Sequence, residues 1–438
     1  MLVQFKVQNF KAFKSEATLS MVASSSDPTR ISDNTFFVDK FNLRLLKSIV
    51  IYGANASGKS KVLEALDFMR TFVIESSKEG QVDEPIRVDP FRLDTTSRKE
   101  PSSFEVVFIS KGVQYRYGFE VSQTEVSAEW LYRKSRVKEI EIFYRTYQDF
   151  ETHKTQFKAN DLVKNKRVRS NALFISVGAS FNDKVSKEVV YWFRSFNMLS
   201  GIDHDRYEAY SVHRLKQQQQ KAEALNFLKA ADFGIEDLNY IELDLDHLPE
   251  DMPEELKEYL REQAKEKTKS EFLANLTTVR RVYDESNVPV GYEKFSIADD
   301  ESAGTRKYFA LSGPILNTLS SGKCIAIDEL ANKLHSLLAC KLINLFNSER
   351  FNDANAQLIF TTHDTNLLGS GIFRRDQIWF TEKNRYGASA LYSLSDFKTD
   401  VVRKSDNFEK NYIKGRYGAI PYLGDFDRVF NQLALADE

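Results

Sequence analysis

Residues 48–66 carry the pattern in this sequence that is most directly suited to chemistry. The apolar residues Ile49 to Tyr52 predict a short strand, and residues 53–60 follow with the pattern G-x-x-x-x-G-K-[ST]. Apolar residues at helical spacing come next, from Val62 to Met69. A strand, a glycine loop and a helix start in this order make a phosphate cradle, because backbone N–H groups and the helix dipole favour an anion there. The alternative is an ordinary glycine-containing turn, and the flanking strand and helix argue against it.

Two side chains of the loop indicate what the cradle would bind. Lys59 would reach the β- and γ-phosphates of a nucleoside triphosphate, and the Ser60 hydroxyl would be a ligand of Mg²⁺. The other contacts would come from the rest of the loop, namely Gly53, Asn55, Ala56, Ser57 and Gly58. The sequence therefore predicts a triphosphate site with Mg²⁺ as its metal.

A second apolar segment, residues 324–327, predicts a strand that ends in Asp328 and Glu329. In folds of this type Mg²⁺ is held by a carboxylate at the carboxyl end of a strand beside the phosphate loop. Asp328 would bind the metal through water, and Glu329 would orient or activate the attacking water. The alternative is an acidic strand end that faces solvent, and the lysine of the phosphate loop makes it the weaker interpretation.

A third apolar segment, residues 357–360, leads into Thr361, Thr362 and His363. His363 could form a hydrogen bond with the γ-phosphate and so sense whether that phosphate is present. A lone histidine is usually structural, but its place after the phosphate-loop strand and the Asp-Glu strand favours a functional role.

Residues 300–308 head a predicted amphipathic helix. Ser302 is a predicted N-cap, and Gly304 would let another backbone approach closely. This pattern is common and carries little weight unless the other three segments accompany it.

The elements that must position these residues fall into three parts, with predicted bounds 1–170, 171–285 and 286–438. In the first part, residues 2–13 predict a strand and turn, and residues 103–121 predict a β-hairpin that continues as an antiparallel meander. Residues 147–170 are hydrophilic and predict a connector. The second part is highly charged with helical spacing, and it predicts a solvated helical arm, with an arm that contacts nucleic acid as the alternative.

Composition narrows the class of protein. The 438 residues include 61 basic and 63 acidic side chains, so no overall basic excess favours nucleic acid, although a local patch could still bind it. Two cysteines, Cys324 and Cys340, are too few for a disulfide framework. The sequence has no signal-peptide core and no run of 18 uncharged apolar residues. We therefore expect a soluble cytoplasmic protein without a membrane partner.

Together the four segments resemble the head of an ABC-type ATPase. Within that class the chain is similar to bacterial ATPases of anti-phage and abortive-infection systems, such as OLD-related proteins, PtuA of Septu and AriA of PARIS. The resemblance includes residues 7–13 and 412–421 and is weak in the helical middle. It implies an α/β fold: a P-loop head with a mixed sheet and an antiparallel β-meander, plus an inserted charged helical arm.

The resemblance also implies roles for single residues. Lys59 and Ser60 would belong to the Walker A motif, Asp328 and Glu329 would be the Walker B pair, and His363 would be the switch histidine. Ser302 and Gly304 resemble a signature loop, which in such proteins caps the nucleotide of a second protomer. That implies slow ATP hydrolysis in a homodimer with two composite sites, which can build into larger oligomers. No glutamine loop can be assigned from the sequence.

The family resemblance further implies partners. The segment after His363 contains no acidic constellation of a nuclease, so we expect the effector, a nuclease or toxin, to be a separate polypeptide. ATP would keep this effector bound, and a phage-encoded trigger would release or activate it. A RecF- or SMC-like DNA-repair ATPase that grips DNA is the alternative from another class, and an interaction module without turnover is a third.

Overall fold

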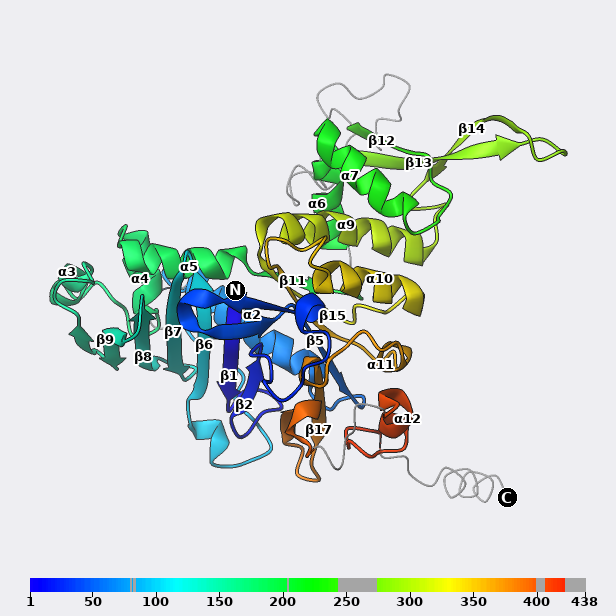
Figure 1. Cartoon of the computed structure of the whole chain (residues 1–438). Coiled ribbons are helices and arrows are strands. Elements are labelled where there is room, and N and C mark those ends of the chain that lie inside the picture. Colours follow the sequence, from blue (N-terminus) through cyan, green and yellow to red (C-terminus); the bar gives the residue numbers. More distant parts are fainter. Residues whose placement is uncertain (79–80, 82–83, 203–204, 243–273, 399–405, 422–438) are drawn as a thin grey trace, which may run out of the picture.

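The computed structural model of the chain describes residues 1–78, 81, 84–202, 205–242, 274–398 and 406–421. Figure 1 shows two large sheets side by side, with helices between and over them. The predicted fold class, an α/β P-loop head with an antiparallel β-meander, is confirmed by this architecture. The division of the chain at residues 170 and 285 remains a prediction.

The first sheet is antiparallel throughout the described residues and contains the predicted hairpin and meander. Its strands, in spatial order, are β10 (Asp149–Thr152), β9 (Glu139–Thr146), β8 (Val126–Lys134), β7 (Val113–Val121), β6 (Ser102–Ser110), β1 (Leu2–Gln8) and β2 (Ala17–Ser20). Lys111 and Gly112 both have positive φ, which is the backbone that a tight two-residue hairpin turn requires. The predicted connector 147–170 differs in part, because β10 lies within it.

The second sheet carries the predicted site. Its strands, in spatial order, are β11 (Asn197–Ser200), β15 (Cys324–Asp328), β16 (Gln357–Thr361), β5 (Ser48–Gly53), β17 (Ile378–Lys383) and β18 (Ser389–Ser393). The first five are parallel, and β18 adds to β17 in the antiparallel sense. Parallel strands end at the same edge of a sheet. The three segments predicted to contact nucleotide therefore end as neighbours, although they lie far apart in the sequence.

Helix α2 (Lys59–Glu75) fills the space between the two sheets. Its buried side chains, Val62, Leu63, Leu66, Met69 and Val73 among them, recur at helical spacing and share one core with both sheets. Strand β5 is buried on both faces: Ile49 and Ile51 belong to the core around α2, and Val50 and Tyr52 belong to the core on the other side. Strand periodicity thus fixes which face of the parallel sheet the phosphate-loop helix covers.

Helices α9 (Ala303–Ser321) and α10 (Ser336–Asn347) cover the opposite face of the parallel sheet (Figure 1). Pro314 lies inside α9, so its nitrogen cannot donate to the Ala310 carbonyl one turn earlier. The Ser211 hydroxyl of α6 (Asp205–Arg214) donates to that carbonyl at 2.6 Å. Ser211 also accepts from the Gly313 N–H at 3.1 Å. Helix α6 is therefore bound to α9 at the position of the proline.

The second predicted part, 171–285, differs from a helical arm. Helices α4 (Phe174–Ser180) and α5 (Lys184–Ser195) pack on the antiparallel sheet, where Trp192 stacks on Phe108 with ring centroids 4.1 Å apart. The prediction of a helical part is wrong for β11, β12 (Asp237–Glu242) and β13 (Ala274–Tyr283), which are strands. In β13 the β-branched residues favour strand despite the charges. Residues 243–273, which belong to the predicted arm, lie outside the described residues.

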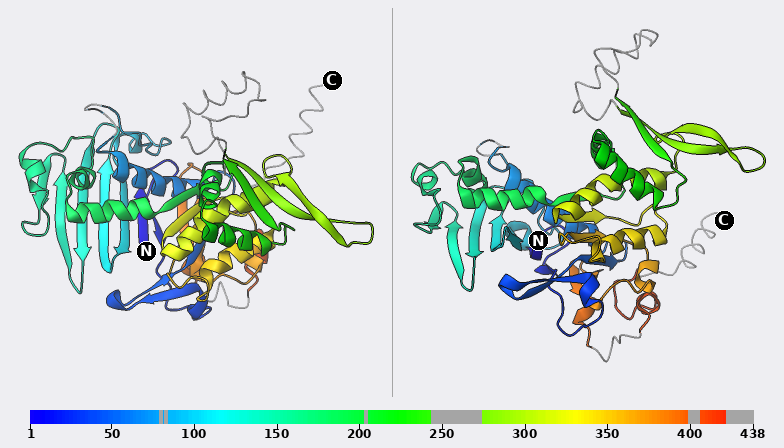
Figure 2. Two further views of the ribbon diagram at one scale, coloured as in Figure 1. Left: turned by 90° about the horizontal axis from the view of Figure 1, so that it is seen from above. Right: turned by 45° about the horizontal axis from the view of Figure 1, so that its top comes forward.

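A small third sheet, β12, β13 and β14 (Pro289–Ser296), extends away from the rest of the chain, as both views of Figure 2 show. The fourth sheet pairs β3 (Thr35–Val38) with β4 (Leu43–Leu46). The remaining described helices are α1 (Ile31–Asn34), α3 (Asn160–Lys164), α7 (Gln218–Lys229), α11 (Asn366–Gly369) and α12 (Phe408–Ile413), with short 3-10 turns at 39–41, 97–99, 375–377 and 394–396.

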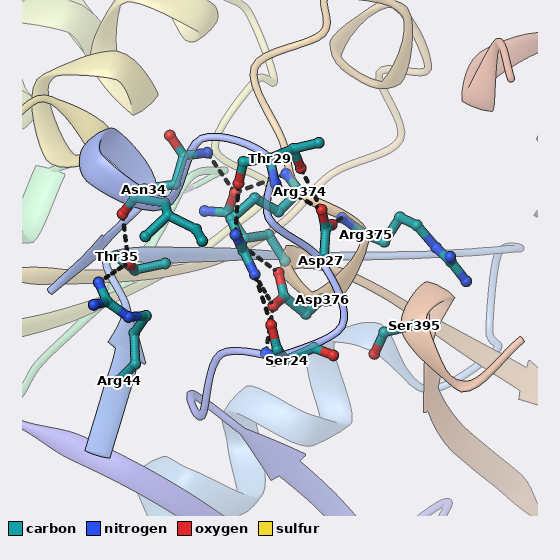
Figure 3. A network of polar contacts seen from close by, with 12 residues as sticks. Ser24, Asp27, Thr29, Asn34, Thr35, Arg44, Arg374, Arg375, Asp376 and Ser395 are labelled. Atoms are coloured by element: carbon teal, nitrogen blue, oxygen red, sulfur yellow. Dashed lines mark hydrogen bonds and ion pairs between the residues drawn. The ribbon is translucent and has the colours of Figure 1, made fainter. Parts of the chain in front are cut away.

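A polar network ties residues 24–35 to the turn that precedes β17 (Figure 3). Arg374 is 1% exposed and forms a two-pronged ion pair with Asp376, at 2.9 and 2.7 Å. The same guanidinium donates to the carbonyls of Thr29 and Ser24, and the Ser24 N–H donates to Asp376. A buried charge is tolerated when its hydrogen-bonding capacity is filled in this way. The network anchors the start of β17, which supports the phosphate loop.

Candidate nucleotide-binding site

The phosphate loop joins β5 to α2 in the predicted order. Gly53 and Gly58 have φ values of 156° and 111°, and Ala56 lies in the left-handed region at 59°. A Cβ on Gly53 would lie 2.5 Å from the Thr381 carbonyl oxygen, so any larger residue would force two strands apart. Both glycines of the pattern are therefore required by backbone conformation and close packing.

Strands β17 and β18 support this loop from one side. Ser57 is buried, and its hydroxyl lies 2.7 Å from the Thr381 hydroxyl of β17. A Cβ on Gly58 would meet the Ser389 hydroxyl of β18 at 2.9 Å. The Ser389 N–H in turn donates to the Ala12 carbonyl at 2.8 Å, which brings the turn after β1 to the loop.

Lys59 is 5% exposed, and its ammonium donates to the carbonyls of Gly53 at 2.9 Å and Ala54 at 3.1 Å. Burial lowers the pKa of Lys59, while the nearby carboxylates of Glu329 and Asp328 raise it. Both hydrogen-bond partners belong to the loop itself. The ammonium is thus held over the cradle by neutral groups, and phosphate oxygens would be stronger partners for it.

Ser60, Asp328 and Thr361 meet at the ends of three elements. The Asp328 Oδ1 atom accepts from the Ser60 hydroxyl at 3.1 Å and from the Thr361 hydroxyl at 2.5 Å. A serine hydroxyl and an aspartate carboxylate are hard oxygen donors that suit Mg²⁺, and this ion takes its other ligands from water and phosphate. The residues present therefore fit the predicted metal. Thr361 was not predicted from the sequence, although its place at a strand end beside His363 could have indicated it.

Glu329 and His363 come just after Asp328 and Thr361 at the same edge of the parallel sheet, and their side chains face each other. The Glu329 Oε1 atom lies 3.1 Å from His363 Nε2, and the Glu329 N–H donates to the Thr361 hydroxyl at 2.8 Å. Glu329 has a φ of 56°, which is uncommon for a residue with a side chain. Burial lowers the pKa of His363, and the positive charge of Lys59 lowers it further. The lowered pKa favours the neutral imidazole, whose ring N–H can donate to a carboxylate or a phosphate.

Ser302 and Gly304 contact the start of α9 and the turn after Glu329. Ser302 caps α9, its hydroxyl accepting from the Thr305 N–H at 3.1 Å as the sequence predicts. A Cβ on Gly304 would lie 2.7 Å from the Lys333 carbonyl, so this helix start packs on the turn after Glu329. Ser302 is exposed, which leaves the first turn of α9 open to a ligand from outside the chain.

Strand β11 is a part of the site that no sequence motif indicated. It pairs with β15 in register, so that Ser200 is opposite Asp328, and the Gly201 N–H donates to the Asp328 carbonyl at 2.5 Å. A cavity of about 580 Å³ opens between α2, β11, α6 and α9, and its lining includes Ser60, Asp328 and Ser200. Because β11 has four residues, its pattern is too short to be separated from the helices around it.

The fold and this site define a P-loop nucleotide-binding head. Residues 48–369 match the family described as "AAA domain, putative AbiEii toxin, Type IV TA system". Because this match spans most of the sequence, the chain belongs to that family. Use of a nucleoside triphosphate with Mg²⁺ is the chemistry that the family implies. No curated protein matches the chain in sequence.

Three solved structures are similar to this chain over most of its length. The SMC head domain from Thermotoga maritima has 12% sequence identity and a TM-score of 0.39, with 90% of this chain and 98% of that chain covered. An SMC head bound to the C-terminal winged-helix domain of ScpA has 10% identity and a TM-score of 0.42, with 90% and 97% covered. The recombination mediator RecF with ATP has 13% identity and a TM-score of 0.33, with 90% and 99% covered.

None of the helices in the described part of the chain combines the length and the apolar character that crossing a membrane would require.

Proposed function

We propose that the chain binds ATP with Mg²⁺ at the Gly53–Ser60 loop and hydrolyses it slowly. The observation that carries this proposal is the convergence of three distant strand ends on the start of α2. Asp328 accepts from Ser60 at 3.1 Å, and Glu329 lies 3.1 Å from His363. A metal ligand, a base and a phosphate sensor would then surround the same phosphates, as phosphoryl transfer to water requires.

Each side chain has a step in this scheme. Lys59 would exchange its two carbonyl partners for oxygens of the β- and γ-phosphates. Mg²⁺, held by Ser60 and through water by Asp328, would neutralise charge on the same phosphates. Glu329 would accept a proton from the attacking water, and neutral His363 would orient the carboxylate or contact the γ-phosphate.

We further propose that two copies of the chain complete each site. Ser302 is exposed at the start of the 19-residue helix α9, and Gly304 contacts the turn after Glu329 rather than the phosphate loop of the same chain. A helix start suits a γ-phosphate that a second copy presents, because the helix dipole and the first N–H groups favour an anion there. The expected assembly is an ATP-dependent homodimer, from which larger oligomers can form.

Substitution of Lys59 tests the binding step. Lys59→Met should abolish Mg²⁺-dependent ATP hydrolysis and weaken binding of a fluorescent ATP analogue by about a hundredfold, since two or more charge-assisted hydrogen bonds are lost. Lys61→Met is the matched control, because Lys61 follows on the same helix but forms an exposed ion pair with Glu64 at 2.6 Å. Equal ATP binding by the two variants would contradict the proposed site.

The biological role that we propose is that of an ATPase subunit in an anti-phage defence system. ATP would hold a separate nuclease or toxin on the assembly, and a phage-encoded trigger would release or activate it. The description of the family, which names a toxin and a toxin–antitoxin system, supports this role. Copurification of the chain with the products of its neighbouring genes, followed by mass measurement with and without ATP, tests it. A chain that copurifies with no effector under either condition would contradict the role.

DNA binding, as in a RecF- or SMC-like repair ATPase, is a second candidate function. The hairpin of β13 and β14 projects from the head (Figure 2) and exposes Tyr283 (53%) and Tyr292 (67%). Exposed aromatic side chains suit nucleic-acid contacts. If DNA is bound there, Tyr292→Ala should weaken salt-sensitive, ATP-dependent DNA binding, whereas Tyr386→Ala, equally exposed at 66%, should not. The absence of salt-sensitive binding in the unmodified chain would exclude this candidate.

A further inference from the structure

Lys307 is a buried cation that lies outside the phosphate loop. It is not among the residues that the sequence predicts to contact nucleotide or metal. It is 0% exposed and lies in the first turns of α9, five residues beyond the N-cap Ser302. A buried ammonium is costly unless all three of its N–H groups have partners. The partners of this side chain are therefore informative about its role.

All three partners are carbonyl oxygens of the turn that follows β15. The Lys307 Nζ atom donates to the carbonyls of Glu329 at 3.0 Å, Leu330 at 2.9 Å and Asn332 at 2.6 Å. This set uses the full donor capacity of an ammonium group. The first of the three carbonyls belongs to the residue that we propose as the catalytic base.

The turn that Lys307 holds has an unusual backbone. Glu329 and Lys333 have φ values of 56° and 62°, although neither is glycine. Such a conformation costs about 1 kcal/mol or more and persists where the surroundings impose it. At its other end the turn packs on Gly304, where a Cβ would lie 2.7 Å from the Lys333 carbonyl. The turn is thus fixed between the start of α9 and the Lys307 ammonium.

We infer that Lys307 is a positioning residue that couples α9 to the carboxylate of Glu329. By fixing the Glu329 carbonyl, Lys307 sets the left-handed backbone that places the side chain 3.1 Å from His363. Any displacement of the first turns of α9 is then transmitted to Glu329 through three hydrogen bonds. A nucleotide bound at the Ser302–Gly304 end of α9 would in this way change the position of the Glu329 carboxylate. This inference rests on the proposed ATPase function and adds to it a link between two parts of the site.

Replacement of Lys307 by methionine tests the coupling. Lys307→Met should lower kcat for ATP hydrolysis by about a hundredfold, because small misplacement of a catalytic group has an effect of that order. The KM and the directly measured affinity for an ATP analogue should change by less than about threefold, since Lys59 and Ser60 are untouched. Lys333→Met is the matched control, because it removes a positive charge from the same turn without removing a donor to the three carbonyls, and its kcat should stay unchanged.

The pH profile of the unmodified protein is a second measurement, and it needs no variant. Burial lowers the pKa of Lys307 to about 8; Lys333 also lowers it, and Glu329 raises it. We expect kcat to fall above pH 8 as the ammonium loses a proton and one hydrogen bond. Because the unfolded chain binds more protons above this pH, the same group makes the free energy of unfolding rise between pH 8 and 10.5. Activity that falls while stability rises separates positioning from loss of fold.

The outcomes are distinguishable. If the unmodified protein hydrolyses ATP and Lys307→Met does so at the same rate, the coupling is wrong and the proposed function stands. If the unmodified protein neither binds nor hydrolyses ATP, the proposed function itself fails. If Lys307→Met does not fold, the pH profile decides, and a kcat that stays constant from pH 7 to 9.5 would overturn the inference.

Discussion

Buried charges occur in both large sheets, but the groups that bond to them differ between the two regions. In the antiparallel sheet Glu129 and Arg145 are both 0% exposed, and each forms several hydrogen bonds with buried groups. Glu129 accepts from the N–H groups of Phe174 at 2.6 Å and Ile175 at 3.0 Å, at the start of α4. It also accepts from the Tyr117 hydroxyl at 3.0 Å, while Arg145 donates to the Ala172 carbonyl at 2.7 Å.

At the carboxyl edge of the parallel sheet the charges have partners that a ligand can replace. Lys59 donates to two carbonyls of its own loop, and Glu329 faces His363, whose side chain is 44% exposed. Removal of one partner from a saturated buried pair leaves an uncompensated charge, so a substitution there lowers stability. Groups with neutral or solvent-facing partners can take up phosphate or a proton. The comparison predicts that substitutions in the first region change stability, and that substitutions in the second change catalysis.

The largest expected effect is catalytic. Glu329→Gln should lower kcat by roughly 10²- to 10⁴-fold, the usual contribution of a general base, and leave ATP binding intact. The uncleaved ATP should trap the closed dimer, which mass measurement with ATP would detect. The free energy of unfolding should stay within about 0.5 kcal/mol of the unmodified value. Unchanged hydrolysis would remove Glu329 from the site.

The matching experiment in the antiparallel sheet is Glu129→Gln. It leaves the Arg145 guanidinium buried without its carboxylate and should lower the free energy of unfolding by about 3–5 kcal/mol. Glu139→Gln is the control, since Glu139 pairs with Arg116 at 2.7 Å on the surface and should cost under about 1 kcal/mol. Denaturant unfolding measures both, and kcat per folded molecule should be the same in each. If Glu129→Gln lowered kcat without lowering the free energy of unfolding, the distinction between the two regions would be wrong.

A smaller effect is expected in the pH dependence. Because burial and Lys59 lower the pKa of His363, the acid limb of kcat should lie below pH 6.5. The unfolded chain then binds more protons than the folded one, so the contribution of His363 to stability is lost as the pH falls through its lowered pKa. An NMR titration of the His363 ring measures this pKa directly. A midpoint above 6.5 would mean that the carboxylates, and not Lys59, dominate the field at this edge.

The smallest effect concerns support of the loop. Thr381→Val removes the hydroxyl that lies 2.7 Å from the Ser57 hydroxyl and keeps the shape of the side chain. The loss of one hydrogen bond should weaken ATP affinity by about fivefold, or about 1 kcal/mol. Titration with a fluorescent ATP analogue checks this. An affinity that does not change would show that the backbone of Gly53 alone fixes the loop.

Much of the fold could be predicted because its signals are local. The hairpin at 103–121 alternates with period two, and α2 repeats its apolar residues with helical period. The arm was predicted less well, because β13 lies within the predicted helical part while its β-branched residues favour strand. Strand β11 escaped prediction because four residues carry almost no periodicity.

The sequence by itself determined the phosphate loop, because all the residues from Gly53 to Ser60 that would contact phosphate are contiguous and their backbone conformation is a local property. It also indicated Asp328, Glu329 and His363 as residues at strand ends. The tertiary structure decided which groups support them: Thr361 under Asp328, Thr381 beside Ser57, and Lys307 on the Glu329 carbonyl. These contacts join residues more than twenty positions apart. They depend on the order and register of strands, which no local pattern contains.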